Sequence, residues 1–481
     1  MTFAPTTNGP LGFAALLLLA SACGDTEAGG DGSDAGSASL GTLTTQPSSG
    51  QPSSGGDGDG DGDGDGDGDG GDDAGMTSNG PASTTGATVP TASGDETGDG
   101  PKFDVPPSPD VGDPCGGKGG DGSGNFSNIW VANAPEGTVS KIDTDTALEV
   151  ARYSTTTNAA DQPSRTSVNQ FGDIAAGHRF AARVVKIAAQ EEDCVDLSGN
   201  GIIETSSGPG DTLPYGTDEC VLWGVDLPPS PQGTRAVAWE GGVFDKATCQ
   251  NTNPNPRLWV AYGTNPLQVY RLDGETGTVL DNTTISSTGF VYGGAVNGDG
   301  DFWVSDRSGR TLSRVDGVTL DVTIFPVPGS NAYGMGVDGD GQPWLATWQS
   351  GAGVDLIYRF NPATETFHPA GGISGRYRGL AIDREDRVWV AGNQPCRLAV
   401  FDRVNDSVID DAIPLPGCSD PVGVTIDRDG FVWVVDRGTS VAWKVDPVTF
   451  TIAATVEGLN GPYTYSDFSG SGLDLVVNPP G

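Results

Sequence analysis

The stretch IDRDGFVWVVD, residues 426–436, has three close counterparts earlier in the chain. They are VNGDGDFWVSD at 296–306, VDGDGQPWLAT at 337–347 and IDREDRVWVAG at 382–392. Each begins with a short apolar run. A turn with acidic residues follows, which in most copies also contains glycine, and then an alternating segment that contains a tryptophan. Two apolar segments joined by such a turn predict a β-hairpin, in which Gly supplies a positive φ and Asp caps the backbone.

The repeat extends over residues 126–478. Its tryptophan position is occupied in seven copies, by Trp130, Ala175, Trp259, Trp303, Trp344, Trp389 and Trp433, and the last four intervals are 44, 41, 45 and 44 residues. Each copy continues with two more strands, such as VAWKVD at 441–446 and TIAATV at 451–456. Four short strands and one tryptophan per repeat predict an all-β, seven-bladed β-propeller, with the tryptophans filling the gaps between blades. Six or eight blades would follow if residues 188–235 are miscounted.

The end of the chain predicts how the ring closes. GPYTYSDFSGSG, residues 461–472, resembles a first strand and turn, but no tryptophan-bearing strand follows it. The blade around NIWVAN, residues 128–133, lacks a first strand of its own. We therefore expect the C-terminal strand to complete the N-terminal blade, which removes free sheet edges. Residues of about 191–220 are expected to form an insertion after the second blade.

The N-terminus has the features of an export signal. Residues 10–22, PLGFAALLLLASA, form a short apolar core that ends in small residues and precedes Cys23. This context resembles a bacterial lipoprotein signal, which implies that residues 1–22 are removed and that Cys23 carries the lipid. Two features depart from that pattern: residues 1–9 contain no Lys or Arg, and Ala20 stands where leucine is usual. The alternative is an ordinary secretory signal, which would make the protein periplasmic or secreted instead of anchored at the outer membrane or cell surface.

Residues 23–125 are predicted to be a disordered, low-complexity linker. They include seven consecutive Asp-Gly pairs at 57–70, and residues 24–128 contain 20 acidic and two basic residues, a net charge of −18. Such a segment cannot bury enough apolar surface to fold, and its charges keep it extended. Since the whole chain carries −39, the remaining residues carry −21. This acidity argues against nucleic-acid binding and against membrane binding through a basic patch, so we expect membrane contact only through the lipid.

Six cysteines remain after Cys23, and an even number in an exported chain predicts disulfides. Proximity in the sequence favours Cys194–Cys220 and Cys396–Cys418, which leaves Cys115 and Cys249 as the third pair. The absence of a Cys-x-x-Cys pair gives little support to a redox or zinc site.

The repeat pattern resembles the virginiamycin B lyase-like and NHL families of seven-bladed propellers. In such propellers ligands bind over the channel, on the face where the loops enter the innermost strands. The corresponding ring positions hold Gly293, Gly334, Gly379 and Gly423, and in the other copies Arg165, Arg235 and Tyr463. The preceding residues and the neighbouring loops add Tyr292, Tyr333, Arg378, Asp306 with Arg307, Asp436 with Arg437, and His178 with Arg179. These side chains suit a carboxylated or sugar-like ligand; the alternative is that they pack and form salt bridges between blades.

The lyase of that family uses a Glu-x-His motif, and this sequence contains none. It has two histidines, His178 and His368, and His368 is expected on an outer strand or turn. The sequence therefore favours a ligand-binding or protein-interaction module at the cell envelope, acting as a monomer. A lyase or hydrolase acting on a small ligand at the channel mouth is the alternative, and a structural surface protein is a third possibility.

One segment of the insertion, DLSGNGIIETSS at 196–207, follows the first half of an EF-hand loop. It offers Asp196, Ser198, Asn200, the carbonyl of Ile202, and Glu204 as ligands for a structural calcium ion. Ser207 stands where the bidentate glutamate is usual, so Asp193, Asp211 or Asp218 would have to replace it. The alternative is a Gly-Asn turn in a disulfide-pinned loop.

Overall fold

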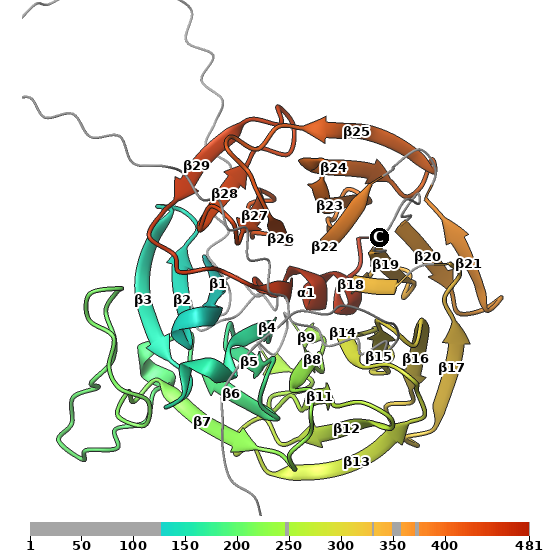
Figure 1. Ribbon diagram of the computed structural model, residues 1–481. Coiled ribbons are helices and arrows are strands. Elements are labelled where there is room, and N and C mark those ends of the chain that lie inside the picture. Colours follow the sequence, from blue (N-terminus) through green and yellow to red (C-terminus); the bar gives the residue numbers. More distant parts are fainter. Residues whose placement is uncertain (1–126, 246–249, 330, 349–356, 371–374, 481) are drawn as a thin grey trace, which may run out of the picture. The chain divides into compact units, whose positions relative to one another are not determined.

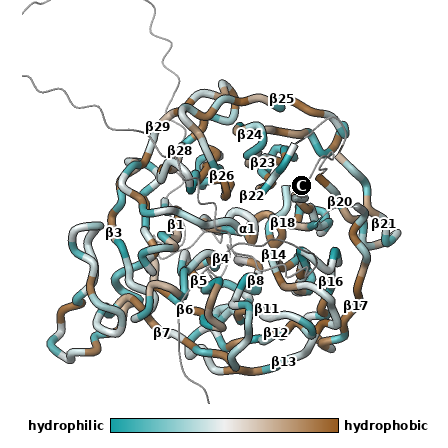
Figure 2. The backbone as a smooth tube through the Cα atoms, in the orientation of Figure 1, coloured by the Kyte–Doolittle hydropathy of each residue, from teal (hydrophilic) through white to brown (hydrophobic). Residues whose placement is uncertain are grey.

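A computed structural model describes residues 127–245, 250–329, 331–348, 357–370 and 375–480. These residues form a ring of seven antiparallel sheets around a central channel (Figure 1). The all-β, seven-bladed propeller predicted from the repeat is therefore confirmed. Figure 2 shows that hydrophobic residues recur in strands all around this ring, between hydrophilic stretches.

The strands of each blade follow one another in the chain, from the channel outward in the later blades. Blade 1 has β1 (Asn128–Asn133), β2 (Thr138–Asp143) and β3 (Leu148–Ser154); blade 2 has β4 (Pro163–Val168), β5 (Ile174–His178), β6 (Arg183–Ile187) and β7 (Val221–Asp226). Blade 3 has β8 (Thr234–Trp239), β11 (Leu258–Tyr262), β12 (Leu267–Leu272) and β13 (Val279–Ile285). Blade 4 has β14 (Val291–Val296), β15 (Phe302–Asp306), β16 (Thr311–Val315) and β17 (Val322–Pro326).

Blade 5 has β18 (Asn331–Val337), β19 (Pro343–Trp348), β20 (Ile357–Asn361) and β21 (Thr366–Pro369); blade 6 has β22 (Arg376–Ile382), β23 (Arg387–Gln394), β24 (Cys396–Asp402) and β25 (Ser407–Ile413). Blade 7 has β26 (Pro421–Ile426), β27 (Val432–Asp436), β28 (Val441–Val445) and β29 (Ile452–Val456). A two-stranded ribbon, β9 (Phe244–Asp245) with β10 (Gln250–Asn251), lies between β8 and β11 in the sequence. In the described ranges, three short 3-10 helices occupy Ala134–Glu136, Ala159–Asp161 and Glu191–Asp193.

The repeated hairpin has the predicted geometry. In blade 7, Oδ1 of Asp427 accepts backbone N–H groups from Asp429 (3.0 Å) and Phe431 (2.9 Å), and Gly430 has a φ of +84°. The turn therefore needs both an acceptor at its start and a residue that tolerates a positive φ. His368 lies in β21, the outermost strand of its blade, as the sequence predicted.

Five of the anchor tryptophans lie in the second strand of blades 3 to 7, and Trp130 lies in β1; each is at most 1% exposed. Several of their indoles pack against aromatic rings of the following blade. The ring centroids are 5.5 Å apart for Trp259–Phe302, 5.7 Å for Trp303–Phe360 and 6.0 Å for Trp344–Phe401. Burying large aromatic surfaces between neighbouring sheets holds the blades together, as the sequence predicted.

The C-terminal segment closes the ring between the first two blades. The backbone N–H of Tyr463 donates to the carbonyl of Ala132 (2.9 Å), and the N–H of Trp130 donates to the carbonyl of Phe468 (2.9 Å), so the segment lies against β1. Its regular strand, β30 (Tyr465–Asp467), instead pairs in parallel with β4 of blade 2. Closure at the N-terminal blade is thus confirmed, but the strand also ties that blade to its neighbour.

A helix that the sequence analysis did not predict follows this strand. The helix α1 (Ser471–Val477) lies at the centre of the ring in Figure 1. Its start is held by Asp467, which accepts backbone N–H groups from Gly470 (2.8 Å) and Leu473 (2.9 Å). A side chain at Gly298, just after β14, would lie 2.7 Å from the carbonyl oxygen of Val476. The helix therefore covers the channel at the end where the inner strands finish.

The insertion is placed differently from the prediction. It joins β6 to β7 and so lies inside blade 2, between the third and the outermost strand, where the sequence analysis placed it after that blade. The prediction failed because Val221–Asp226, the displaced fourth strand, is separated from its blade by more than 30 residues. The disulfide Cys194–Cys220 joins the two ends of the insertion.

Candidate functional site

The predicted site residues lie at the channel end opposite α1. Tyr292, Tyr333 and Arg378 are at the beginning of the inner strands β14, β18 and β22, whereas α1 lies beyond the ends of these strands. Asp306 and Asp436 end the second strands β15 and β27, which run antiparallel to the inner strands. The antiparallel register therefore brings both groups to the same face.

Four buried tyrosines form a layer across this end of the channel. We call Tyr292, Tyr333, Tyr463 and Tyr465 the tyrosine layer; each is at most 2% exposed. The hydroxyl of Tyr463 lies 2.6 Å from that of Tyr333 and 3.0 Å from that of Tyr292. Burial raises the pKa of Tyr333 and Tyr465 well above its ordinary value, so both hydroxyls stay protonated. These two hydroxyls are thus neutral members of a hydrogen-bonded network.

Six arginines surround this layer, which we call the arginine cluster: Arg165, Arg179, Arg235, Arg307, Arg378 and Arg437. Their guanidinium carbons lie 3.2 Å (Arg165–Tyr465), 4.6 Å (Arg179–Tyr463), 5.3 Å (Arg235–Tyr292), 5.2 Å (Arg307–Tyr292), 5.4 Å (Arg378–Tyr333) and 5.4 Å (Arg437–Tyr463) from ring centroids. Such distances allow cation–π attraction, on the order of 0.5–2 kcal/mol per contact. The predicted arginines and tyrosines therefore converge.

The arginines differ in how their charges are balanced. Asp420 pairs with Arg378 (3.1 Å) and with Arg437 (2.7 Å). Burial opposes the charge of Arg378, but the neighbouring tyrosine hydroxyls and Asp420 raise its pKa above the usual value. Arg165 donates from Nε to the carbonyl of Tyr292 (2.8 Å) and from Nη2 to the hydroxyl of Tyr465. Neither Arg165 nor Arg235 forms a salt bridge with a residue that the structure describes.

The two predicted aspartates hold loops of this face. Oδ1 of Asp306 accepts the backbone N–H of Gly309 (2.8 Å), and Asp436 accepts the N–H groups of Ser419 (2.9 Å) and Asp420 (3.1 Å). Burial raises the pKa of Asp306 to about 6, although backbone N–H groups that include that of Gly309 oppose the shift. Both side chains are at most 1% exposed, so they act on the site through the loops that they hold.

His178 lies between neighbouring strands and does not join the tyrosine layer. It is fully buried, and its Nε2 lies 2.9 Å from Oγ1 of Thr155. Burial, together with the nearby charge of Arg183, lowers its pKa to about 4, so the imidazole is neutral at pH 7. Its contacts are those of a packed, hydrogen-bonded side chain.

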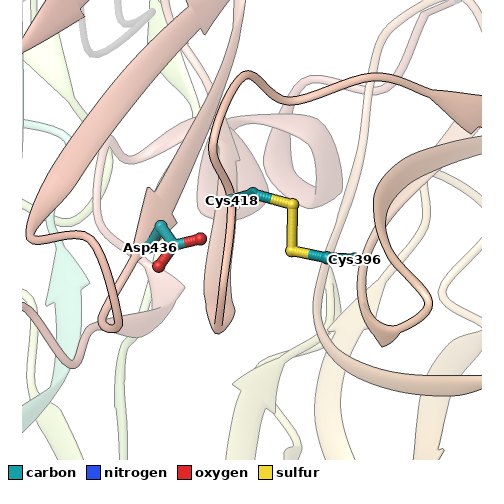
Figure 3. A group of neighbouring side chains, drawn as sticks. All are labelled: Cys396, Cys418 and Asp436. Atoms are coloured by element: carbon teal, nitrogen blue, oxygen red, sulfur yellow. A yellow bond between two sulfur atoms is a disulfide. The ribbon is translucent and has the colours of Figure 1, made fainter. Parts of the chain in front are cut away.

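The disulfide Cys396–Cys418 lies beside Asp436, as Figure 3 shows. Within the described residues, these three form a group whose sulfur and carboxylate atoms lie within 4.8 Å of one another. The sulfurs are covalently bonded to each other, so they are not thiolate ligands for a metal. Instead, the disulfide and Asp436 both fix the loop that carries Asp420, the partner of two arginines.

The predicted calcium loop is internally hydrogen-bonded. Asp196 accepts the backbone N–H groups of Gly199 (2.6 Å) and Gly201 (2.8 Å), which lowers its pKa. Asn200 donates to Glu204 (2.6 Å). Two of the residues proposed to replace the missing glutamate bind serines of the loop: Asp218 accepts from Ser206, and Asp211 accepts from Ser207. A further carboxylate, that of Glu219, accepts the backbone N–H groups of Ser198 and Glu204, both at 2.8 Å. Glu219 was not predicted because it lies 15 residues beyond Glu204.

A cavity of about 60 Å³ lies in the middle of the channel. Its walls come from the inner strands and from α1, and they include Val237, Gly294, Met335, Leu380, Val424 and Leu473. The mostly apolar lining distinguishes it from the arginine cluster at the channel mouth.

The disulfides Cys194–Cys220 and Cys396–Cys418 are confirmed, and they indicate an oxidising compartment outside the reducing cytosol. Cys23, Cys115, Cys249 and the predicted signal and linker lie outside the described residues. Of the residues that the structure describes, no helix combines the length and the apolar character needed to cross a membrane.

No family model and no curated protein matches this sequence. Among solved structures, virginiamycin B lyase from Staphylococcus aureus has 13% identity and a TM-score of 0.45, covering 63% of this chain and 89% of its own. AztD from Citrobacter koseri has 14% identity and a TM-score of 0.44 (70% and 96% covered). The WD40 β-propeller domain of Doa1 has 10% identity and a TM-score of 0.45 (72% and 92% covered). The sheet topology of this chain identifies it as a seven-bladed propeller. No activity of these three proteins is assigned to it.

Several members of the site were not predicted. Tyr465 follows Tyr463 at a spacing of two, and both belong to the tyrosine layer. They lie in an irregular segment, residues 462–468, of which only three residues form β30. No sequence pattern marks Asp420 as a site residue, apart from its position directly before β26. Phe180 and Phe290 flank Arg235, with ring centroids 5.9 and 5.7 Å from its guanidinium carbon.

Proposed function

We propose that the protein is an exported, lipid-anchored propeller that binds a ligand at the channel mouth, over the arginine cluster and the tyrosine layer. The ligand is a small molecule or an exposed part of another protein. The observation that supports this proposal is the convergence of six arginines and four tyrosines from different blades on one end of the channel. Ligand sites commonly combine apolar surface with a few convergent polar groups, as here.

The opposite end of the channel supports this choice of face. There α1 occupies the centre of the ring, and Arg384 forms an ion pair with Asp474 of the helix. A ligand that approaches the channel axis from the tyrosine side meets arginines from five blades, whereas from the other side it meets the helix.

A ligand screen tests the binding proposal. The full chain is mixed with a library of small metabolites and peptides, and binding is detected by a rise in melting temperature. Hits should lose at least about 10-fold in affinity in Tyr333→Phe, which removes one hydroxyl donor, because a good polar contact is worth about 1.4 kcal/mol. The control is Tyr358→Phe, which alters a tyrosine outside the layer. Hits that respond equally to both variants would contradict the site.

The anchor has a separate test. Palmitate labelling of the expressed full chain should be abolished by Cys23→Ser and unaffected by Ser21→Ala. Labelling that persists in Cys23→Ser would contradict the lipid anchor and leave the binding proposal intact.

A further inference from the structure

Arg235 is the most unusual charged residue of the arginine cluster. Its side chain is fully enclosed, with the residue 1% exposed, and Nε and Nη2 have no hydrogen-bond partner among the described residues. Its nearest ring neighbours are Tyr292, Phe290 and Phe180, and Phe180 itself is 45% exposed. The guanidinium therefore lies within 6 Å of the rings of Phe180 and Phe290, which we call the aromatic rim, and Phe180 reaches the surface.

Arg165 lies near the same ring, that of Tyr292. Its guanidinium carbon is 4.6 Å from the centroid of Tyr292, and that of Arg235 is 5.3 Å away. Arg165 is 0% exposed, and its Nη1 has no hydrogen-bond partner in the described part of the chain. Two buried cations thus share one aromatic ring and leave three nitrogens unsatisfied.

This arrangement is costly in the unliganded protein. A buried charge without a counter-ion loses its hydration, and each unsatisfied buried donor costs on the order of 1–3 kcal/mol. The chain has ample carboxylates, with 64 acidic residues against 25 basic ones. Nevertheless none of the described carboxylates pairs with either arginine, so the described part of the propeller does not supply the missing acceptor.

We infer that the missing acceptor is an anionic group of the ligand, a carboxylate or a phosphate, which Arg235 and Arg165 bind together beneath the aromatic rim of Phe180 and Phe290. The fork of N–H donors on a guanidinium matches two oxygens of either group. The rim then contacts an apolar or aromatic part of the same ligand. This inference rests on the proposed function and adds to it the chemical class of the ligand.

The test uses four probes: inorganic phosphate, phenyl phosphate, benzoate and the neutral isostere benzamide. Binding to the full chain is measured by calorimetry and by the shift in melting temperature. We expect phenyl phosphate or benzoate to bind, and benzamide to bind at least 10-fold more weakly because it cannot neutralise the arginines. Comparison of benzoate with the two phosphates distinguishes a carboxylate from a phosphate ligand.

Arg235→Met provides a readout that a structural role would not produce. Methionine keeps much of the side-chain volume, and replacing a buried charge by an apolar residue is often neutral or stabilising. We expect Arg235→Met to melt at the same or a higher temperature and to lose anion binding at least 10-fold. Arg428→Gln, which removes one positive charge from an exposed turn beyond β26, should bind the probes as the wild type does.

The inference is overturned if no anionic probe binds the wild type with a Kd below about 10 mM, or if Arg235→Met binds the anions equally well. It is also overturned if Arg235→Met destabilises the fold and leaves binding unchanged. If a neutral ligand binds through Tyr333 but no anion does, the inference that the ligand is anionic is wrong, while the proposed ligand-binding function stands.

Discussion

The indole Nε1 of Trp433 donates a hydrogen bond of 2.9 Å to Oδ2 of Asp427, six residues earlier in the chain. The other carboxylate oxygen of Asp427 holds the hairpin turn, and Nζ of Lys444 lies 3.3 Å from Oδ2. One buried carboxylate therefore joins the turn, the tryptophan and the third strand of the blade. Trp344 and Trp389 make the same bond to Asp338 (2.8 Å) and Asp383 (2.7 Å).

Asp427→Asn should destabilise the protein by about 2–4 kcal/mol, because an amide NH₂ cannot accept from the indole and leaves the lysine charge unpaired. Urea unfolding followed by tryptophan fluorescence measures the change in free energy. Asp429→Asn, an exposed residue of the same turn, serves as the control and should change stability by less than about 0.5 kcal/mol. Equal effects of the two substitutions would contradict the role given to Asp427.

Asp306→Asn should stabilise the protein at pH 8 and have little effect at pH 4. Burial raises the pKa of Asp306 to about 6 in the folded protein, from 3.8 ordinarily. The folded state therefore binds the proton more tightly, and stability falls as pH rises from about 4 to about 6. Above pH 6 the carboxylate of Asp306 is charged, and the full cost of burying that charge lowers the stability. Its removal should raise the free energy of unfolding by about 1–3 kcal/mol. Urea unfolding at both pH values tests this, and a gain that does not depend on pH would refute it.

Asp420 and Arg378 should show strong energetic coupling. Asp420→Asn leaves the buried guanidinium of Arg378 without its carboxylate, which we expect to cost about 2–4 kcal/mol. In the Arg378→Met background the same substitution should cost less than about half as much, although Arg437 still contacts Asp420. A double-mutant cycle in urea measures the coupling, and additive effects would show that the pair is not coupled.

We propose that the loop around Asp196 binds calcium as a structural ion, with Glu219 in place of the usual last ligand. Calcium should then raise the melting temperature of the full chain, and EDTA should lower it to the value of Asp196→Ala. Asp316→Ala is the matched control, because its carboxylate also accepts turn N–H groups, from Val318 and Thr319, but lies in blade 4. A melting temperature that responds to neither calcium nor EDTA would contradict the proposal.

The fold was predictable because its signal is repeated. The spacing of the tryptophans identifies the blades, and even the substituted copy at Ala175 was correctly placed in β5. Non-repeated features had no such signal. Helix α1 has seven residues, follows Gly470 and contains Gly472, so it is too short and too poor in helix formers for periodicity to indicate it. The six-residue Asp–Trp spacing was visible in three blades, but its hydrogen bond depends on the side-chain geometry.

The candidate site was predictable only in part. The ring alignment brought Arg165, Arg235, Tyr292, Tyr333, Arg378 and Tyr463 to one channel end, which follows from strand order alone. The pairing of charges did not follow, since Asp420 lies in a loop whose path is set by the disulfide Cys396–Cys418 and by Asp436. The isolation of Arg235 from every described carboxylate is likewise a three-dimensional property.

The parallel pairing of Tyr465 with Arg165 joins residues 300 positions apart. Since β30 is the last strand of the described propeller and pairs with β4, one of its first, the blades can stack one after another before the ring closes. Contacts so distant in sequence form late, because the entropy of closing the intervening loop must be overcome first. A chain that lacks β30 and the residues around it should therefore leave sheet edges unpaired in blades 1 and 2. Such edges are exposed to proteases and can pair with other incompletely folded copies.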